Sequence, residues 1–444
     1  MRLSLTALAC SALLLTACDD VIVENPAVEY TPETAPAAAA TRLAVSPRIR
    51  AQPADAPAAP AAPAAPAAAP RTPARAPALA AEPQRVTGGP GPRRRVVEPD
   101  PPFVSTPVAT LNEPWAMAFL PDGRLLVTEK NGTLRLVNVA TGQVGTITGV
   151  PRVAYGGQGG LGDVILHPQF ASNRRIYLSY VEQSGAIYGA VVVRAQLDLG
   201  SGNNGNLTGI TRIWEQAPKV SGQGHFSHRL AFDANRKLWI TSGDRQKFDP
   251  AQDMGGNLGK LIRLNDDGTA PSDNPFYAQG GNAAQVWTLG HRNPLGIAFD
   301  AEGRLWSHEM GPEGGDELNL ILRGRNYGWP LVSEGNHYGG GPIPRHSTRP
   351  DFEAPKEWWT PVIAPAGMII YSGNLFRTFR GDAFIGGLAS QALVRVRFNG
   401  TSASEYRRYG MGRRIRDVEQ GPDGAIWLLE DGGNGRLLKL TPPG

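Results

Sequence analysis

The chain has 444 residues, and its 44 Lys and Arg against 40 Asp and Glu give a formal net charge of +4. This mild excess of basic residues, without a long basic run, argues against nucleic-acid binding. The two cysteines, Cys10 and Cys18, both lie near the N-terminus. The remainder of the chain therefore has no disulfide, no thiolate metal site and no cysteine nucleophile.

Residues 1–17 have the pattern of a bacterial lipoprotein signal peptide. An early Arg2 is followed by a short apolar run and by the sequence LTAC, which ends at Cys18. The run is too short to span a membrane as a stable anchor. We expect cleavage before Cys18 and lipidation of that residue, which would tether the protein to a membrane on the periplasmic side of a bacterial cell envelope. An ordinary cleaved signal with an incidental cysteine is the alternative.

Residues 18–102 are rich in alanine and proline, as in the stretch APAAPAAPAAAP. Proline interrupts helices and sheets, and this composition offers little apolar surface to bury. The composition predicts a disordered, extended linker. Such a linker would hold the domain that follows, residues 103–444, away from the membrane.

Residues 103–444 contain a recurring unit of an apolar strand, a turn with Asp, Asn or Gly, and a second apolar strand. Copies lie at 116–129, 163–180, 229–244, 296–309, 376–388 and 418–431. Alternating apolar residues around such turns are typical of β-hairpins, and no long segment has helical periodicity. The six copies predict an all-β domain, a six-bladed β-propeller of four-stranded antiparallel blades. Functional residues are then expected in the loops at one end of its central channel.

The segment 289–330 is the richest in residues that carry chemistry. It contains Arg292 beside Asn293, an acidic glycine-rich loop at 311–317, and the aromatic sequence NYGWP. Oxygen donors on a tight loop suit Ca²⁺, and an arginine next to an amide suits a planar anionic ligand. We interpret this segment as the floor of a cofactor and metal site.

A histidine precedes the third predicted hairpin. His225, in GQGHFSHRLAFD, can act as a general base near neutral pH because its ordinary pKa is close to 6.5. A structural histidine bonded to a loop carbonyl is the other reading. His228 is a second candidate three residues later, and the sequence does not decide between the two.

Two further loops carry candidate ligand contacts. Gln158 lies in the glycine-rich sequence YGGQGGLGD, which lets backbone approach a ligand closely. No helix follows it, so it is not a nucleotide fingerprint, and a flexible connecting loop is the alternative. Arg414 and Arg416 are two apart on an extended segment, so they share a face and can clamp one anion. A solvated surface pair is the alternative there.

Five motifs resemble those of a known family. In chain order they are GQGHFSHRL, LGHRNPLG, MGPEGGDELN, NYGWP and RRIRDV. They resemble the soluble glucose/sorbosone dehydrogenases that use pyrroloquinoline quinone (PQQ), and in particular the bacterial aldose sugar dehydrogenases. The resemblance covers residue 103 to the C-terminus. It implies a six-bladed propeller that oxidises the anomeric C1 hydroxyl of aldose sugars to lactones and passes electrons on to a quinone or a redox protein.

The resemblance also implies roles for individual residues. His225 would take the proton of the C1 hydroxyl, and Arg292 would polarise the quinone oxygens. Cofactor contacts would come from Gln158, Arg292, Asn293, Tyr338, Ala389, Ser390, Gln391, Arg414 and Arg416. One Ca²⁺ site would use the Glu317 side chain and the Tyr327 backbone, and the carbonyls of Gly311 and Pro312 would hold a Ca²⁺ beside the cofactor.

The chain departs from the glucose enzymes at two places. Gly224 stands where they carry a carboxylate just before the catalytic histidine, so another group must orient the imidazole. A lysine that contacts the cofactor in those enzymes is replaced within Gly387-Leu388-Ala389-Ser390-Gln391.

Two other functions are compatible with a propeller, a Ca²⁺-dependent lactonase or hydrolase and a non-catalytic binding propeller. A lactonase or hydrolase would give no role to the Arg414/Arg416 pair or to Arg292 and Asn293. A non-catalytic binding propeller requires that the cofactor contacts are lost.

Overall fold

The computed structural model describes residues 100–444. The predicted signal peptide, the lipidated Cys18 and the linker up to residue 99 lie outside the described residues. The described part is all-β, as predicted, with one α-helix of four residues, α1 (Phe170–Asn173). Short 3₁₀ helices are η1 (Asp249–Ala251), η2 (Tyr277–Gln279), η3 (Ala283–Gln285), η4 (His346–Thr348) and η5 (Arg377–Phe379).

Within residues 100–444 the strands form five sheets. One sheet contains, in spatial order, β1 (Val104–Leu111), β24 (Gly435–Thr441), β23 (Ile426–Glu430) and β22 (Ile415–Gln420). Three further sheets have sequential order: β10 (Ser227–Phe232), β11 (Leu238–Ser242), β12 (Lys260–Leu264) and β13 (Val286–Leu289); β14 (Pro294–Phe299), β15 (Leu305–Glu309), β16 (Asp316–Ile321) and β17 (Glu357–Trp359); β18 (Pro365–Ile370), β19 (Ala383–Gly387), β20 (Ala392–Asn399) and β21 (Ser402–Gly410).

The fifth sheet has eight strands, made of two antiparallel runs of four. The first run is β2 (Pro114–Phe119), β3 (Leu125–Glu129), β4 (Thr133–Asn138) and β5 (Gln143–Thr148). The second is β6 (Leu161–Leu166), β7 (Arg175–Ser184), β8 (Ile187–Leu199) and β9 (Gly205–Glu215). The runs are joined by a short parallel pairing of β5 with β9, in which Ile147 faces Gly205.

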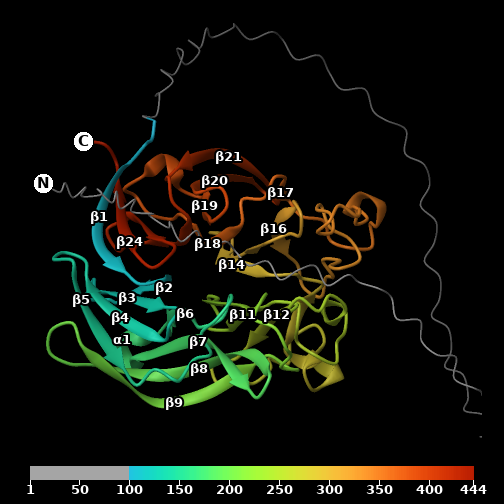
Figure 1. The fold of residues 1–444 in the computed structure, drawn as a ribbon, viewed down its shortest axis with the longest axis horizontal. Helices are drawn as coiled ribbons and strands as arrows, with labels where there is room; N and C mark the ends of the chain where they lie inside the picture. Colours follow the sequence, from blue (N-terminus) through green and yellow to red (C-terminus); the bar gives the residue numbers. More distant parts are fainter. Residues whose placement is uncertain (1–99) are drawn as a thin grey trace, which may run out of the picture. The chain divides into compact units, whose positions relative to one another are not determined.

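The first strands of these runs contact one another in a closed ring, in the order β2, β6, β10, β14, β18 and β22, with β22 next to β2. The ring is closed from outside by the two ends of the described chain. Strand β1 pairs antiparallel with β24, so that Val104 faces Thr441, and Figure 1 shows this pair as blue beside red. Closure of this kind leaves no long unpaired edge between the first and the last sheet.

Every first strand begins with a β-bulge. The register to the next strand shifts at Pro114/Ala116, Leu161/Val164, Ser227/Leu230, Pro294/Gly296, Pro365/Met368 and Ile415/Asp417. A bulge turns the following side chain to a new direction and often lies next to a functional site. Each loop that precedes a first strand therefore enters its sheet next to a bulge.

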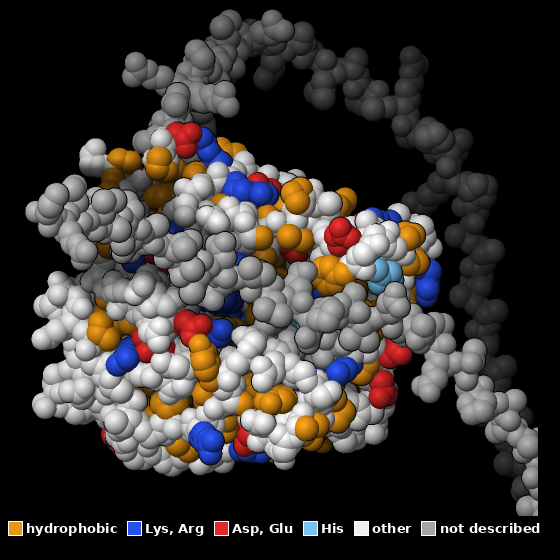
Figure 2. Space-filling model, in the orientation of Figure 1, with side chains coloured by type: hydrophobic (Ala, Val, Ile, Leu, Met, Phe, Trp, Pro, Cys, Tyr) orange, Lys and Arg blue, Asp and Glu red, His pale blue; other side chains and the backbone are white. Residues whose placement is uncertain are grey.

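The hydrophobic core lies between neighbouring sheets. One buried cluster joins Leu126 and Leu136 of the first run to Leu178 and Val191 of the second. Such aromatic and aliphatic contacts across the sheets hold the ring together without any disulfide. Among residues 100–444, no helix has the length and apolar character needed to cross a membrane. On the face seen in Figure 2, acidic and basic side chains are interspersed.

Five of the six predicted hairpins coincide with observed strand pairs, namely β2/β3, β6/β7, β10/β11, β14/β15 and β22/β23. The prediction for 376–388 is wrong in its first half. There, η5 replaces the strand, and the true partner of β19 is β18, which lies earlier in the chain. Phe376 and Phe379 are buried and stack on each other at 4.7 Å between ring centroids. Short apolar runs of this kind do not distinguish a strand from a buried turn.

Candidate functional site

The candidate residues lie in the loops that lead into the first strands. Gln158 precedes β6, His225 precedes β10, and Arg292 with Asn293 precedes β14. Direct contacts join these loops. The Gln158 Oε1 atom accepts a hydrogen bond from the His225 backbone N–H at 2.7 Å. The Asn293 Oδ1 atom accepts one from the Ser227 hydroxyl at 2.9 Å.

A buried carboxylate orients the imidazole of His225. The Nδ1 atom of His225 lies 2.7 Å from Asp244 Oδ1, and Asp244 Oδ2 accepts a hydrogen bond from Trp329 Nε1 at 2.8 Å. An ionised carboxylate only accepts hydrogen bonds, so Nδ1 of His225 must carry its proton. The lone pair is then on Nε2, which is the nitrogen able to take a proton from a ligand.

The carboxylate missing at Gly224 is therefore supplied by Asp244, from the end of the same hairpin. The space next to Gly224 is filled by the Gln246 side chain, because a Cβ atom at Gly224 would lie 2.5 Å from it. The group that must orient the imidazole is present, but at a position 20 residues further along the chain than in the glucose-enzyme pattern.

The electrostatics keep His225 neutral. Burial and then the positive charge of Arg292 lower the pKa of His225, although Asp244 acts in the opposite direction. Burial alone would raise the pKa of Asp244. The charge and hydrogen bond of His225, together with Arg292, outweigh this effect and leave the Asp244 pKa lowered. At neutral pH the pair is an ionised carboxylate beside a neutral imidazole, which is the state that a general base requires.

The backbone around His225 is strained. His225 and His228 have φ values of +49° and +57°, a region that residues other than glycine rarely adopt. The close approach of β11 requires Gly243, since a Cβ atom there would lie 2.1 Å from the His225 carbonyl oxygen. Strain of this kind persists at functional sites because the surrounding structure fixes it.

His228 faces a different environment from His225. Its ring stacks on Trp115 at 5.2 Å between centroids, and its Nδ1 lies 2.8 Å from the Ser179 hydroxyl. Burial lowers the pKa of His228 to about 3. Of the two histidines between which the sequence left the choice open, His225 is the one beside Asp244 and Arg292.

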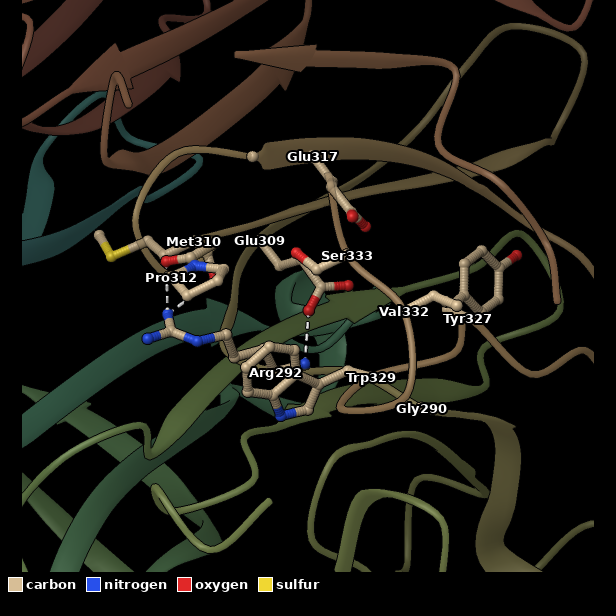
Figure 3. A pocket seen from close by; sticks show the side chains of 12 residues that line it. Gly290, Arg292, Glu309, Met310, Pro312, Glu317, Tyr327, Trp329, Val332 and Ser333 are labelled. Atoms are coloured by element: carbon tan, nitrogen blue, oxygen red, sulfur yellow. Dashed lines mark hydrogen bonds between the residues drawn. The ribbon is translucent and has the colours of Figure 1, made fainter. Parts of the chain in front are cut away.

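Arg292 connects the histidine to the glycine-rich loop. Its Nη1 donates to the carbonyl oxygens of Gly311 at 2.6 Å and Met310 at 3.0 Å, and its Nη2 donates to Tyr338 Oη at 3.1 Å. Figure 3 shows the guanidinium lying beside Met310 and Pro312. The Nε atom of Arg292 is buried without a hydrogen-bond partner in the described part of the chain. A buried donor of this kind costs about 1–3 kcal/mol unless a ligand satisfies it.

Next to Arg292 lies a small acidic cavity of about 10 Å³, close to the minimum that holds one water-sized ligand. It is lined by Gly290, Arg292, Glu309, Met310, Gly311, Pro312, Gly315, Glu317, Tyr327, Trp329, Val332 and Ser333 (Figure 3). The residues of both predicted calcium sites line this cavity, namely Glu317 and Tyr327 of the first site and Gly311 and Pro312 of the second.

Two buried carboxyl groups line the cavity and lie close enough to influence each other. Glu309 and Glu317 are both buried, and burial followed by the charge of Glu309 raises the pKa of Glu317 well above its ordinary value. The Asn319 Nδ2 atom lies 3.3 Å from an oxygen of each of these two carboxyl groups. Because this amide is uncharged, it does not neutralise them. Within residues 100–444, no three His, Cys, Asp or Glu side chains are grouped to hold a metal on their own. A cation here would therefore need backbone carbonyls as well.

Two of the expected carbonyl ligands already accept hydrogen bonds. Gly311 O accepts one from Arg292, and Tyr327 O accepts one from His346 Nε2 at 3.0 Å. Each carbonyl oxygen has a second lone pair, which remains available to a cation. The donor set, carboxylate and carbonyl oxygens with no sulfur or nitrogen, fits a hard cation such as Ca²⁺.

Arg414 and Arg416 converge on one carboxylate of the chain itself. The Nε atoms of both donate to Asp431, each at 2.8 Å. Burial would raise the pKa of Asp431, but the two arginines outweigh it and lower the pKa to about 2. Two cations share one carboxylate, so the group keeps a net positive charge with which to bind an anionic ligand.

The turn that contains Ala389, Ser390 and Gln391 joins β19 to β20. The backbone N–H groups of Ala389 and Ser390 donate to Ile363 O at 3.0 and 3.2 Å. This places the turn beside the start of the first strand β18. The Ser390 hydroxyl is buried without a partner in the described chain, so a ligand that reaches this turn could satisfy it.

Comparison with known proteins decides the family. The model of the glucose/sorbosone dehydrogenase family matches residues 111–439. The chain belongs to this family. Membership identifies it as an oxidoreductase of the sugar dehydrogenase class, and the resemblance seen in the five motifs is confirmed.

Individual relatives of the glucose/sorbosone dehydrogenase family are similar over most of the chain. Aldose sugar dehydrogenase YliI of Escherichia coli (strain K12) is 40% identical over 339 residues, which are 75% of this chain and 91% of that protein. The apo crystal structure of the soluble E. coli aldose sugar dehydrogenase has a TM-score of 0.72 at 37% identity and covers 77% of this chain and 100% of its own.

A ligand-bound member has also been solved. The PQQ-bound form of the aldose sugar dehydrogenase from Streptomyces coelicolor has a TM-score of 0.62 at 29% identity, and it covers 76% of this chain and 98% of its own. The glucose/sorbosone dehydrogenase fold of the present chain thus extends over nearly the whole length of both solved structures.

Three acidic residues of the site were not predicted, namely Asp244, Glu309 and Asp431. A signal for them existed in the sequence. The hairpin copies 229–244, 296–309 and 418–431 each end in an acidic residue. In each copy this carboxylate binds residues just before or at the start of the first strand of the same hairpin: His225, the Arg292 backbone N–H, and Arg414 with Arg416.

The His225 pair can be tested by nuclear magnetic resonance titration of the imidazole. We expect the pKa of His225 to lie below 6.5, because burial and Arg292 disfavour the imidazolium. Asp244→Asn removes the one group that favours the imidazolium and should lower this pKa further. The matched control is Asp249→Asn, an exposed site in η1, which should leave it unchanged. A wild-type pKa above 6.5 would contradict the electrostatic analysis.

Proposed function

We propose that the chain is a PQQ- and Ca²⁺-dependent aldose dehydrogenase that oxidises the anomeric C1 hydroxyl of aldose sugars to lactones. The observation that carries this proposal is the His225–Asp244 pair beside Arg292 at the acidic cavity. The PQQ-bound structure of the S. coelicolor relative supports the choice of cofactor. The names of the E. coli relatives support the class of substrate.

The proton is handled by His225. The chemistry that PQQ supplies when bound is acceptance of a hydride from the sugar C1. Nε2 of His225 takes the proton of the C1 hydroxyl, since Nδ1 is committed to Asp244. Asp244 then stabilises the imidazolium, and Trp329 holds the second oxygen of this carboxylate so that it does not turn away. Arg292 supplies positive charge where negative charge develops on the cofactor.

The cofactor is held by positive charge and by hydrogen-bonding groups. Arg414 and Arg416 offset carboxylates of the cofactor, with Asp431 fixing the direction of both guanidinium groups. The buried polar atoms without partners, Arg292 Nε and Ser390 Oγ, fit a ligand that brings acceptors. The other contact residues are Gln158, Asn293, Tyr338, Ala389 and Gln391.

Calcium would be held by residues that line the acidic cavity. The Glu317 side chain and the Tyr327 backbone would bind one Ca²⁺, which would remove the repulsion between Glu309 and Glu317 that otherwise favours protonation of Glu317. The backbone carbonyl oxygens of Gly311 and Pro312 would bind a Ca²⁺ beside the cofactor, where it would act as a Lewis acid on the developing negative charge.

We also propose an architecture and a cellular location for the protein. Residues 103–444 form a six-bladed propeller, in which the eight-stranded sheet is two blades joined at their outer edges. Residues 1–17 are a lipoprotein signal peptide, and 18–102 are a linker to lipidated Cys18. The enzyme works on the periplasmic side of a bacterial membrane and passes electrons to a quinone or a redox protein.

The direct test is reconstitution of activity. Protein produced without PQQ is mixed with PQQ and Ca²⁺, then with glucose and an artificial dye acceptor, and dye reduction is followed. We expect reduction only when cofactor, cation and sugar are all present. Lactone hydrolysis without PQQ would instead favour the hydrolase reading, and failure to bind PQQ would favour the binding propeller.

His225→Ala should lower kcat by roughly 10²–10⁴-fold, the range lost with a general base. PQQ affinity should stay within about threefold, under 1 kcal/mol, because the charged cofactor contacts remain. Steady-state kinetics and PQQ titration measure the two quantities separately. Turnover at the wild-type rate would remove His225 as the base.

Replacing Arg414 and Arg416 together with Ala should weaken PQQ binding by about tenfold or more, or about 1.4 kcal/mol. The double replacement Arg407→Ala/Arg408→Ala on β21 removes the same charge from an ion-paired surface position and is the control. Fluorescence titration with PQQ gives both affinities. Equal affinities in the two double variants would place the Arg414/Arg416 pair outside the cofactor site.

Ca²⁺ should raise the unfolding temperature of the wild type, and Glu317→Gln should abolish this shift. A ligand at 100 times its Kd stabilises by about 2.7 kcal/mol, which is a measurable change. The control is Glu313→Gln, an exposed carboxylate in the same loop, which should retain the shift. The measurement is a thermal melt with and without Ca²⁺. A Ca²⁺ shift that survives in Glu317→Gln would move the cation elsewhere.

A further inference from the structure

A buried arginine directly follows Asp244 in the chain. The side chain of Arg245 is only 1% exposed. Burial lowers its pKa to about 10, although the charge of Asp244 acts in the opposite direction. A charged group is costly to bury unless hydrogen bonds offset the lost hydration. The contacts that Arg245 makes therefore indicate what this side chain does in the protein.

The guanidinium of Arg245 binds the loop that carries His225. Its Nε donates to Gly224 O at 2.8 Å, and its Nη2 donates to Gly222 O at 2.5 Å. Both glycines lie in the loop before β10. Its Nη1 donates to the carbonyl oxygen of Tyr188, in β8 of another sheet, at 2.6 Å. The three nitrogen atoms of one guanidinium thus tie this loop to a strand of the neighbouring sheet.

Arg245 also contacts the two residues that follow Gly224. Its backbone N–H donates to His225 O at 3.3 Å. The guanidinium carbon lies 3.7 Å from the centre of the Phe226 ring, which is buried. A guanidinium over an aromatic face is held by the attraction of its charge to the ring as well as by stacking. Both chain neighbours of His225 are therefore fixed by the same side chain.

The backbone on both sides of this contact has an uncommon conformation. His225 and Ser227 have φ values of +49° and +61°, and Arg245 and Gln246 both have a φ of +58°. Residues with a side chain keep such values only where the surrounding structure holds them. The hydrogen bonds of Arg245 are contacts of this kind, because they join the two strained segments directly.

We infer that Arg245 is a positioning residue for the general base, and that its forked guanidinium fixes residues 222–226 so that the imidazole of His225 stays on Asp244. The inference rests on the proposed function, in which His225 takes the proton of the sugar. Arg245 acts through His225 and not on the sugar. A lysine could not replace it, because one ammonium group does not present the planar fork that reaches carbonyls on two sides.

The charge of Arg245 favours the same state of the base. Burial and Arg292 lower the pKa of His225 most, and the positive charge of Arg245 acts in the same direction. A neutral imidazole can accept a proton, whereas an imidazolium cannot. Position and charge are separable, because a lysine at this place keeps the charge and loses the fork.

The kinetic test is Arg245→Lys, assayed with PQQ, Ca²⁺ and glucose. It should lower kcat by about 10²-fold, the loss expected when a catalytic group is displaced, and leave KM nearly unchanged. Arg263→Lys is the matched control, because Arg263 is another buried arginine, with Asp273 and Trp287 as its partners. This control should keep the wild-type kcat. A wild-type kcat in Arg245→Lys, or a change in KM alone, would overturn the inference.

Nuclear magnetic resonance of the cofactor-free protein gives a reading that needs no turnover. The Nδ1 proton of His225 should give a signal shifted downfield by its hydrogen bond to Asp244, and His225→Ala assigns this signal by removing it. We expect the signal in the wild type and in Arg263→Lys, and its loss or broadening in Arg245→Lys. All spectra are taken at a temperature at which circular dichroism shows each variant folded. An unchanged signal in Arg245→Lys would contradict the positioning role.

A second variant decides the question if Arg245→Lys does not fold. Phe226→Leu keeps the hydrogen bonds of Arg245 and removes the ring that lies against its guanidinium. It should broaden the Nδ1 proton signal and lower kcat, and a wild-type signal with a wild-type kcat would overturn the inference. A wild type that is inactive with glucose contradicts the proposed function, while the Nδ1 proton signal still decides the role of Arg245.

Discussion

The carboxylate of Asp244 fixes the geometry on which the site depends. One of its oxygens binds His225 and the other binds Trp329, so a strand end, the loop before β10 and the loop after β16 are held at one point. Glu309 and Asp431 do the same for Arg292 and for the arginine pair. In each case the end of a second strand fixes the loop that enters the first strand. A rigid hairpin therefore positions a side chain that would otherwise sit on a mobile loop.

Most of the fold could be predicted because strand and turn signals are local. Alternation of apolar residues and the Asp-Gly turns gave the all-β class and five of the hairpins correctly. The fifth copy failed because the buried Phe376 and Phe379 imitate a strand, while the real strand β18 lies before them. The pairing of β5 with β9 could not be predicted, since it joins segments about 58 residues apart through two residues only.

Site residues that stand in a sequence motif could be predicted. Site residues whose role depends on a contact between distant parts of the chain could not. His225, Arg292 and Glu317 stand in motifs, and the structure brings them to one end of the ring. The choice of His225 over His228 depends on the positive φ values and the bulge in β10, which no periodicity reveals. Asp244 replaces the carboxylate absent at Gly224 from 20 residues away. The role of Asp244 follows from strand pairing. From the sequence, one could see only that several hairpin copies end in an acidic residue.

The central claim is that hydride leaves C1 of the sugar while His225 takes the proton. The most direct measurement is a single-turnover experiment on the protein loaded with PQQ and Ca²⁺, in which absorbance of the bound quinone is followed after mixing with glucose or with glucose deuterated at C1. The account predicts quinone reduction that is slower with the deuterated sugar. Reduction at equal rates throughout the pH range, or no reduction by any aldose, would contradict it.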